Sequence, residues 1–168
     1  DILAAHRITT GRLAASRLLA ICTSCTRAAM ISVVIPTLNE EHALPSTLAL
    51  LAAQDFPHET VICDGGSTDA TSRVANQPGV QWITAPRGRG AQMNAGAQAA
   101  RGNWLLFLHA DTLLPAGALE AIAALPPPIK AGCFHQAFND RRLLLRLVSR
   151  LHNWRCKRTQ IIYGDQAM

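Results

Sequence analysis

The sequence predicts an α/β fold, a doubly wound and mainly parallel sheet with helices on both faces. Apolar runs rich in β-branched residues alternate with segments of helical periodicity, which is the pattern of parallel α/β sheets. Gly, Pro, Asn and Asp residues separate these runs. Of 168 residues, 49% are hydrophobic and 16% charged, which suits one globular domain and argues against disorder.

Two regions are expected. Residues 1–29, rich in Ala, Leu and Arg, form an upstream extension that is helical or poorly ordered, and Arg17 interrupts the apolar run that a signal peptide needs. Residues 30–168 form the predicted domain. Because the sequence begins with Asp1 and stops on a strand-like run, we expect this domain to be truncated at its C-terminus.

The first strand is expected at residues 31–35, a β-branched run that ends at Pro36. Asn39 should cap the helix that follows, which runs to about Gln54. The acid at Glu40 lies in the first turn of this helix, where the helix dipole favours negative charge.

The second strand is expected at residues 59–63, and Ser67 or Thr68 should cap a helix after it. Residues 80–84 form a short third strand.

Further along, an Ala-rich helix at residues 91–102 should close at Gly102. The most apolar strand follows at residues 103–108, and a helix near residues 116–125 should stop before three prolines. Residues 131–138 are expected to form one more strand.

Charge is segregated along the chain. Residues 141–158 carry seven basic residues and no acid, whereas the whole chain has a net charge of +5. Arg142, Arg146 and Arg150 recur at helical spacing beside a leucine-rich face, which predicts an amphipathic helix. Either this helix packs its apolar face into a core, or it lies on an anionic membrane surface. Nucleic acid is not an expected partner, because aromatic residues are not interleaved with the basic run.

The five cysteines are scattered and form no disulfide framework. Cys22 and Cys25 form one C-x-x-C pair, but no second pair of zinc ligands follows at suitable spacing. We therefore expect a cytoplasmic protein, with peripheral contact at the inner membrane face through residues 141–158 as a further prediction.

Three polar clusters, at residues 36–40, 64–69 and 109–112, follow expected strands and should meet at one sheet edge, where such sheets bind ligands. Asp111 follows an apolar strand that anchors its backbone, and its carboxylate suits Mg²⁺ or Mn²⁺. His109, two residues earlier on an extended chain, would point to the same side and join it. The alternative is that Asp111 caps the next loop or helix and that His109 is a partly buried imidazole.

Asp64 ends the second strand ahead of Gly65 and Gly66. Its carboxylate suits hydrogen bonds from a base or ribose, with an Asx-turn as the alternative. Arg87 and Arg89 lie in a glycine-containing loop and suit a diphosphate, with a solvated loop as the alternative. The glycine spacing in that loop does not match the dinucleotide-binding fingerprint, so a nicotinamide cofactor is excluded.

Taken together, several segments resemble the family 2 glycosyltransferases of the GT-A fold: SVVIPTLNEE, DGGSTDAT, RGRGAQMNAGAQAARGNWLLFLHADT, GCFHQAFNDR and YGDQAM. The resemblance covers residues 30–168 and is greatest to a bacterial subgroup found beside radical-SAM and selenium-related genes. It implies the nucleotide-diphospho-sugar transferase type of fold. It also implies transfer of a sugar, with inversion, from a UDP- or GDP-linked donor to a lipid-linked or small-molecule acceptor.

The resemblance also implies roles for particular residues. His109 and Asp111 fall at the family's D-x-D motif and would bind Mn²⁺ or Mg²⁺ at the donor diphosphate. The implied nucleotide-sugar-binding positions are Pro36, Thr37, Asn39, Glu40, Asp64, Gly66, Arg89, Asn94 and Ala110.

Two departures from the family pattern bear on catalysis. His109 stands where the D-x-D motif has its first acid, and no E-D pair, the family's usual general base, occurs before Met168. Asp165 is the only late carboxylate available as a substitute base. One alternative is therefore a nucleotide-sugar-binding fragment without catalysis. A sugar nucleotidyltransferase is more distant, because it would have a glycine-rich basic loop where this chain has PTLNEE.

Overall fold

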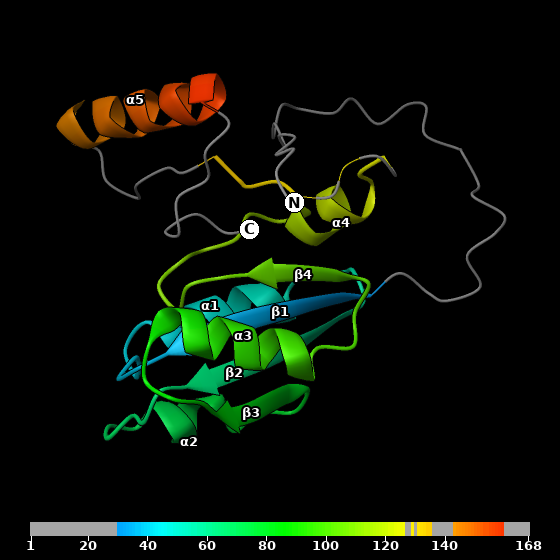
Figure 1. Cartoon of the computed structure of the whole chain (residues 1–168), viewed down its shortest axis with the longest axis vertical. Coiled ribbons are helices and arrows are strands. Elements are labelled where there is room, and N and C mark those ends of the chain that lie inside the picture. The colour runs from blue at the N-terminus through cyan, green and yellow to red at the C-terminus, as the bar shows by residue number, and fades with distance from the viewer. Residues whose placement is uncertain (1–29, 127–128, 130, 136–142, 160–168) are drawn as a thin grey trace, which may run out of the picture. The chain divides into compact units, whose positions relative to one another are not determined.

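The computed structural model describes residues 30–126, 129, 131–135 and 143–159. The described residues up to Leu125 form one compact unit, and those from Pro126 onward belong to a second. The first unit contains the sheet, and the second contains helix α5, Leu143–Thr159 (Figure 1). The expectations for residues 1–29 and for Asp165 lie outside the described residues.

Four parallel strands form the sheet of the first unit, in the order β3-β2-β1-β4. Their bounds are β1 Ile31–Thr37, β2 His58–Asp64, β3 Val80–Thr84 and β4 Trp104–Phe107. Strand β1 is paired on both sides, and the strand order reverses between β1 and β4. The topological switch point, where open α/β sheets bind ligands, therefore lies beside the carboxyl end of β1.

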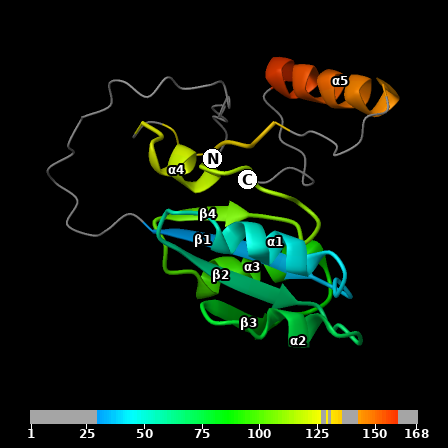
Figure 2. The ribbon, with the colours of Figure 1, turned by 180° about the vertical axis from the view of Figure 1, so that it is seen from behind.

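Helices cover both faces of the sheet, as the sequence predicted. Their bounds are α1 Leu44–Ala52, α2 Thr71–Ala75, α3 Arg89–Ala99 and α4 Ala118–Ala123. Helix α3 crosses one face, over β1 and β2 (Figure 1). Helix α1 lies across the opposite face, with α2 beside it (Figure 2). Within the described residues, no helix is long and apolar enough to cross a membrane.

One buried cluster of the core lies where α3 packs on the sheet. Val34, Val61 and Cys63 are fully buried there. Gly96 of α3 lies directly above them, since a Cβ atom on it would come within 2.3 Å of Val34 Cγ1 and 2.5 Å of Cys63 Sγ. Its missing side chain therefore sets how closely the helix approaches the sheet. Burial also raises the pKa of the Cys63 thiol to about 11, so this cysteine is a protonated core residue at neutral pH.

Two expected helix caps are wrong. Helix α1 begins at Leu44, five residues after Asn39, and neither it nor α2 has a side-chain cap. Helix α2 begins at Thr71, beyond Ser67 and Thr68. In both cases the polar side chain is engaged instead with a neighbouring loop, as described below, so it is not available to cap the helix.

The expected closure of α3 at Gly102 is also wrong, because the helix ends at Ala99 and Ala100 is extended. Gly102 instead lies where the chain passes close to β1. A Cβ atom there would come within 2.7 Å of both Met30 O and Ser32 N. The strand expected at residues 131–138 is not formed in its described part: Ala131 makes an isolated bridge and residues 132–135 are not in a strand.

Candidate functional site

Three loops leave the carboxyl ends of β1, β2 and β4 at one edge of the sheet. Strand β1 carries Pro36 at this edge without loss of a ladder hydrogen bond. Val34 O accepts a hydrogen bond from Leu108 N at 3.0 Å, so Val34 and Pro36 face β4, and β4 pairs with β1 only as far as Val34. The ring of Pro36 therefore lies beyond the paired region, where its lack of an N–H has no consequence.

Asp64 closes the loop after β2. Its Oδ2 accepts hydrogen bonds from the main-chain N–H groups of Gly66 and Ser67, both at 2.9 Å, and its Oδ1 accepts one from the Ser67 hydroxyl. The bond to Gly66, two residues on, is an Asx-turn, and Gly66 has a positive φ of 96° that suits glycine. Asp64 is only 5% exposed. Three of about four acceptor directions on the carboxylate are used, which leaves capacity for one more donor.

The loop after β1 is tied to the loop after β2. Asn39 N donates to Ser67 Oγ at 2.9 Å, and Asn39 Oδ1 accepts from Thr68 N at the same distance. Asn39 has the left-handed φ of 59°, which asparagine adopts more readily than most residues. Asn39, one of the predicted nucleotide-sugar-binding residues, therefore shapes both loops.

A second set of bonds joins the same two loops further from the sheet. Glu40 N donates to Thr71 Oγ1 at 2.8 Å, and Glu41 N donates to Asp69 Oδ2 at 3.2 Å. In return, Ala70 N donates to Glu41 Oε2 at 2.8 Å. The side chains of Glu41, Asp69 and Thr71 thus hold the two segments together.

Gln92 joins the carboxyl ends of β1 and β2, where these loops begin. It lies on α3, is 4% exposed, and its Nε2 donates to Thr37 O at 2.6 Å and to Cys63 O at 2.7 Å. Gln92 is not among the residues that the sequence motifs predicted for the site. The signal was its spacing: Gln92 and Gly96 are four apart, so both face the sheet. Asn94 is exposed, about 200° around the helix from Gln92, so the structure does not bring it to the strand ends.

The loop after β4 is a turn and not a continuation of the strand. Strand β4 ends at Phe107, and Thr112 N donates to His109 O at 3.1 Å, which closes the turn. The premise that His109 and Asp111 lie on one extended chain is therefore wrong. Asp111 is exposed, as a ligand-binding carboxylate requires.

Thr47 of α1 holds this turn in place. Its buried hydroxyl donates to Ala110 O at 2.6 Å. Ala110 itself is 3% exposed, so its side chain packs inward while the adjacent Asp111 faces solvent. Thr47 is a second positioning residue that the sequence analysis missed, because its partner lies 63 residues away.

Negative charge accumulates where the loops after β1 and β4 approach. The pKa of Glu40 is raised, first by burial and then by the charges of Asp111 and Asp69, while His109 acts in the opposite direction. Glu40 and Asp111 thus interact across the switch point.

A divalent cation fits this pair of carboxylates in sign and in ligand type. Within the described residues, no cluster of three or more His, Cys, Asp or Glu side chains is arranged to hold a metal. Two carboxylates suit a Mg²⁺ or Mn²⁺ ion of the kind that takes one or two protein ligands and completes its shell with phosphate oxygens.

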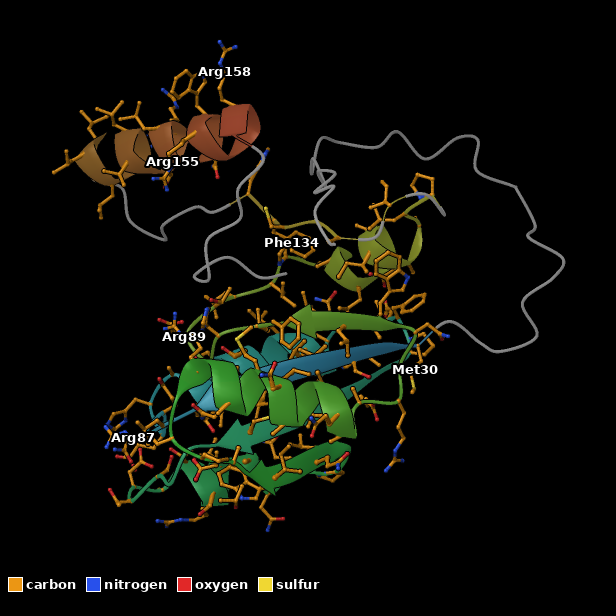
Figure 3. All side chains as sticks on the ribbon, viewed as in Figure 1. Met30, Arg87, Arg89, Phe134, Arg155 and Arg158 are labelled. Atoms are coloured by element: carbon orange, nitrogen blue, oxygen red, sulfur yellow. The ribbon has the colours of Figure 1, made fainter. Side chains whose placement is uncertain are left out.

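Two arginines lie at the same end of the sheet. Figure 3 shows Arg87 on the loop between β3 and α3 and Arg89 at the start of α3, at the end to which the strands point. Both are exposed. Gly88 between them has a φ of 135°, a value that L side chains rarely adopt, so this glycine sets the turn that presents them.

The sequence profile described as Glycosyl transferase family 2 matches residues 32–125, which include β1 to α4 and all three loops. The chain belongs to this family. Family 2 glycosyltransferases transfer sugars, and the profile covers every described residue assigned above to the site. The family prediction made from the motifs is confirmed, and the predicted fold is confirmed by the parallel sheet and by the solved structures below.

Several curated relatives of this family 2 chain come from mycobacteria. A PGL/p-HBAD biosynthesis glycosyltransferase from Mycobacterium bovis is 43% identical over 114 residues, which cover 58% of this chain and 41% of that protein. An uncharacterized glycosyltransferase, Mb0553, from Mycobacterium bovis is 37% identical over 95 residues, which cover 56% of this chain and 42% of that protein. The chain therefore spans about two fifths of the length of these relatives.

Among solved structures, S. aureus TarS 1–349 in complex with UDP aligns with a TM-score of 0.52 and 30% sequence identity. The alignment covers 56% of this chain and 31% of that one. A second structure of S. aureus TarS 1–349 aligns with a TM-score of 0.53 over the same share of each chain.

Proposed function

We propose that this chain contains the donor-binding part of a glycosyltransferase that moves a sugar from a UDP- or GDP-linked donor to an acceptor, with inversion at the anomeric carbon. The observation that carries the proposal is that the charges of Glu40 and Asp111 interact at the edge of a family 2 sheet where Asp64 ends the neighbouring strand β2. That S. aureus TarS, of similar fold, was solved with UDP supports a uridine nucleotide as one donor moiety.

The nucleoside would bind beside the loops after β1 and β2. Pro36, Thr37 and Asn39 line one loop, and Asp64 and Gly66 the other. The buried Oγ1 of Thr37 has no hydrogen-bond partner among the described residues, and such a group favours a ligand that would satisfy it. The free acceptor direction of Asp64 would take an N–H or O–H of the base or ribose.

The diphosphate would lie toward the turn after β4. Asp111, with Glu40 nearby and His109 as a further ligand, would hold Mn²⁺ or Mg²⁺, and Arg89 would face phosphate oxygens. The cation, when bound, supplies positive charge that offsets the charge developing on the leaving nucleotide. The protein's own part is to hold these groups, and Thr47 does so for the turn.

Inversion would need a general base on the face of the sugar opposite the leaving group. Asp165 remains our prediction for that role, outside the described residues. A lipid-linked or small-molecule acceptor, a cytoplasmic location and membership of the radical-SAM-associated subgroup also remain predictions.

Nucleotide affinity tests the proposal directly. Replacing Asp64 by Asn keeps the size of the side chain but removes the charge that strengthens its hydrogen bonds, so UDP or GDP should bind about tenfold more weakly in calorimetry without metal. Asp55→Asn, at an exposed carboxylate before β2, is the matched control and should bind as the parent does. Equal dissociation constants for the parent and Asp64→Asn, with both chains folded by circular dichroism, would count against the nucleoside site.

A further inference from the structure

Helix α5 exposes its apolar side. Nine large hydrophobic side chains are recorded as exposed in the described residues, and six of them lie on this helix with exposed fractions from 43% to 81%. At about 100° per residue they fall within an arc of about 140°. They are Leu143, Leu144, Leu147, Val148, Leu151 and Trp154.

The side of α5 opposite the apolar arc is the more buried side. Ser149 is only 8% exposed, and Leu145 and Asn153 are half-buried. A surface helix of a globular protein normally does the reverse and buries its apolar stripe. The described structure therefore does not show the core-packed apolar face that was one of the two expectations for this segment.

Basic side chains border the exposed apolar arc. Arg146 and Arg150 lie along one side of it, Arg155 lies within it near the other edge, toward the C-terminal end of the helix, and all three are exposed. Arg158 projects from the C-terminal end of the helix (Figure 3). Residues 141–158 contain no acid that could neutralise this charge within the segment.

We infer that α5 lies in the interface of an anionic membrane, with its apolar arc among the acyl chains and its arginines at the headgroups. An in-plane helix of this kind combines a wide apolar face with Lys or Arg on its polar flanks. Trp154 stands within the apolar arc, and tryptophan favours the boundary between lipid and water.

The basic charge of α5 favours an anionic membrane over a second copy of the chain as the partner of its apolar arc. Two α5 helices packed face to face would bring arginine-lined flanks together, and like charges in an interface are repulsive. An anionic lipid surface is complementary in sign and attracts each basic residue. The inference rests on α5 alone, so it stands or falls independently of the proposed sugar transfer.

Vesicle co-sedimentation of the full chain tests this inference. Vesicles of phosphatidylglycerol and phosphatidylcholine in equal parts should bind the protein, and vesicles of phosphatidylcholine alone should not. The double variant Leu147→Gln/Leu151→Gln should bind the anionic vesicles at least about tenfold more weakly, because two leucines no longer enter the lipid. Leu50→Gln, at an exposed leucine of α1, is the matched control and should bind as the parent does.

The charge contribution is tested separately. Arg150→Gln should weaken binding to anionic vesicles by about fivefold, which is the contribution of one basic residue near an anionic surface. Arg73→Gln on α2 should leave this binding unchanged. Three outcomes would overturn the inference: no preference for anionic vesicles, unchanged binding by the double leucine variant, or a concentration-dependent dimer of the parent that the double variant abolishes in sedimentation velocity.

Discussion

The Nε2 atom of Gln92 donates a hydrogen bond to the main-chain oxygen of Thr37 at 2.6 Å, and a second to that of Cys63 at 2.7 Å. One side chain from α3 therefore joins the carboxyl ends of β1 and β2. The loops that contain Asn39 and Asp64 begin at these ends, so the packing of α3 on the sheet is linked to the geometry of the site.

Gln92→Ala should lower both stability and nucleotide affinity. The variant leaves the oxygens of Thr37 and Cys63 without this donor, at a cost of about 1–3 kcal/mol, and loosens the loops that follow. Urea denaturation and UDP titration measure the two effects. Gln98→Ala, at an exposed position of the same helix, should change neither. A Gln92→Ala variant as stable as the parent would show that the two bonds contribute little.

Gly96→Ala and Gly90→Ala should act in different ways although both lie on α3. The Cβ atom at residue 96 would press on Val34 and Cys63, which should lower the free energy of unfolding by about 1–3 kcal/mol. At residue 90 nothing lies within 4 Å of an added Cβ, so alanine should be neutral or stabilise by up to about 1 kcal/mol. Equal effects of the two changes in chemical denaturation would contradict the close helix–sheet approach.

Glu59 should make stability depend on pH in the acid range. Burial acts to raise the pKa of Glu59, but hydrogen bonds from Ser32 Oγ at 2.5 Å and from Arg101 N at 2.5 Å outweigh it and hold the pKa below its usual value. A lowered pKa in the folded state contributes stability above the unfolded pKa, and this contribution is lost as the pH falls through the folded value.

The free energy of unfolding of the parent should therefore decrease as the pH falls from about 5 through the lowered pKa of Glu59, and Glu59→Gln should show a smaller decrease from a lower starting value. Asp55→Asn removes an exposed carboxylate elsewhere and should keep the slope of the parent. Denaturation curves at a series of pH values measure this slope. Parallel curves for the parent and Glu59→Gln would contradict the role of this bond network.

The strands were predictable because their signal is local. Consecutive apolar residues such as those of β1 need no knowledge of distant partners, and the predicted strand at residues 31–35 differs from the observed β1 only at its C-terminal end. The predictions of helix caps were wrong because the deciding contacts are not local. Asn39, Ser67 and Thr68 are suitable caps by residue type, but their partners lie across two loops 28 or 29 residues apart in sequence.

The residues of the candidate site also fall into two groups, those with a local sequence signal and those without one. The location of Asp64 and Asp111 at this edge was predictable, since Asp64 ends one apolar strand, Asp111 comes three residues after the apolar run of another, and strand ends share one edge of a parallel sheet. Their roles in binding stay predictions. Gln92 and Thr47 were not predictable, because their hydrogen bonds reach main-chain oxygens 29 to 63 residues away. The turn at residues 109–112 was missed because the apolar run continues through Leu108, one residue past the end of β4, and so predicts a longer strand.

Calorimetry of UDP- and GDP-linked sugars with the parent chain and with Asp111→Asn, each with and without Mn²⁺, tests the central claim most directly. We predict that in the presence of Mn²⁺ the variant binds the preferred donor about tenfold more weakly than the parent, and that without metal the two bind equally. Equal affinities with Mn²⁺ present, or no binding of any of these sugars by the parent, would contradict the account.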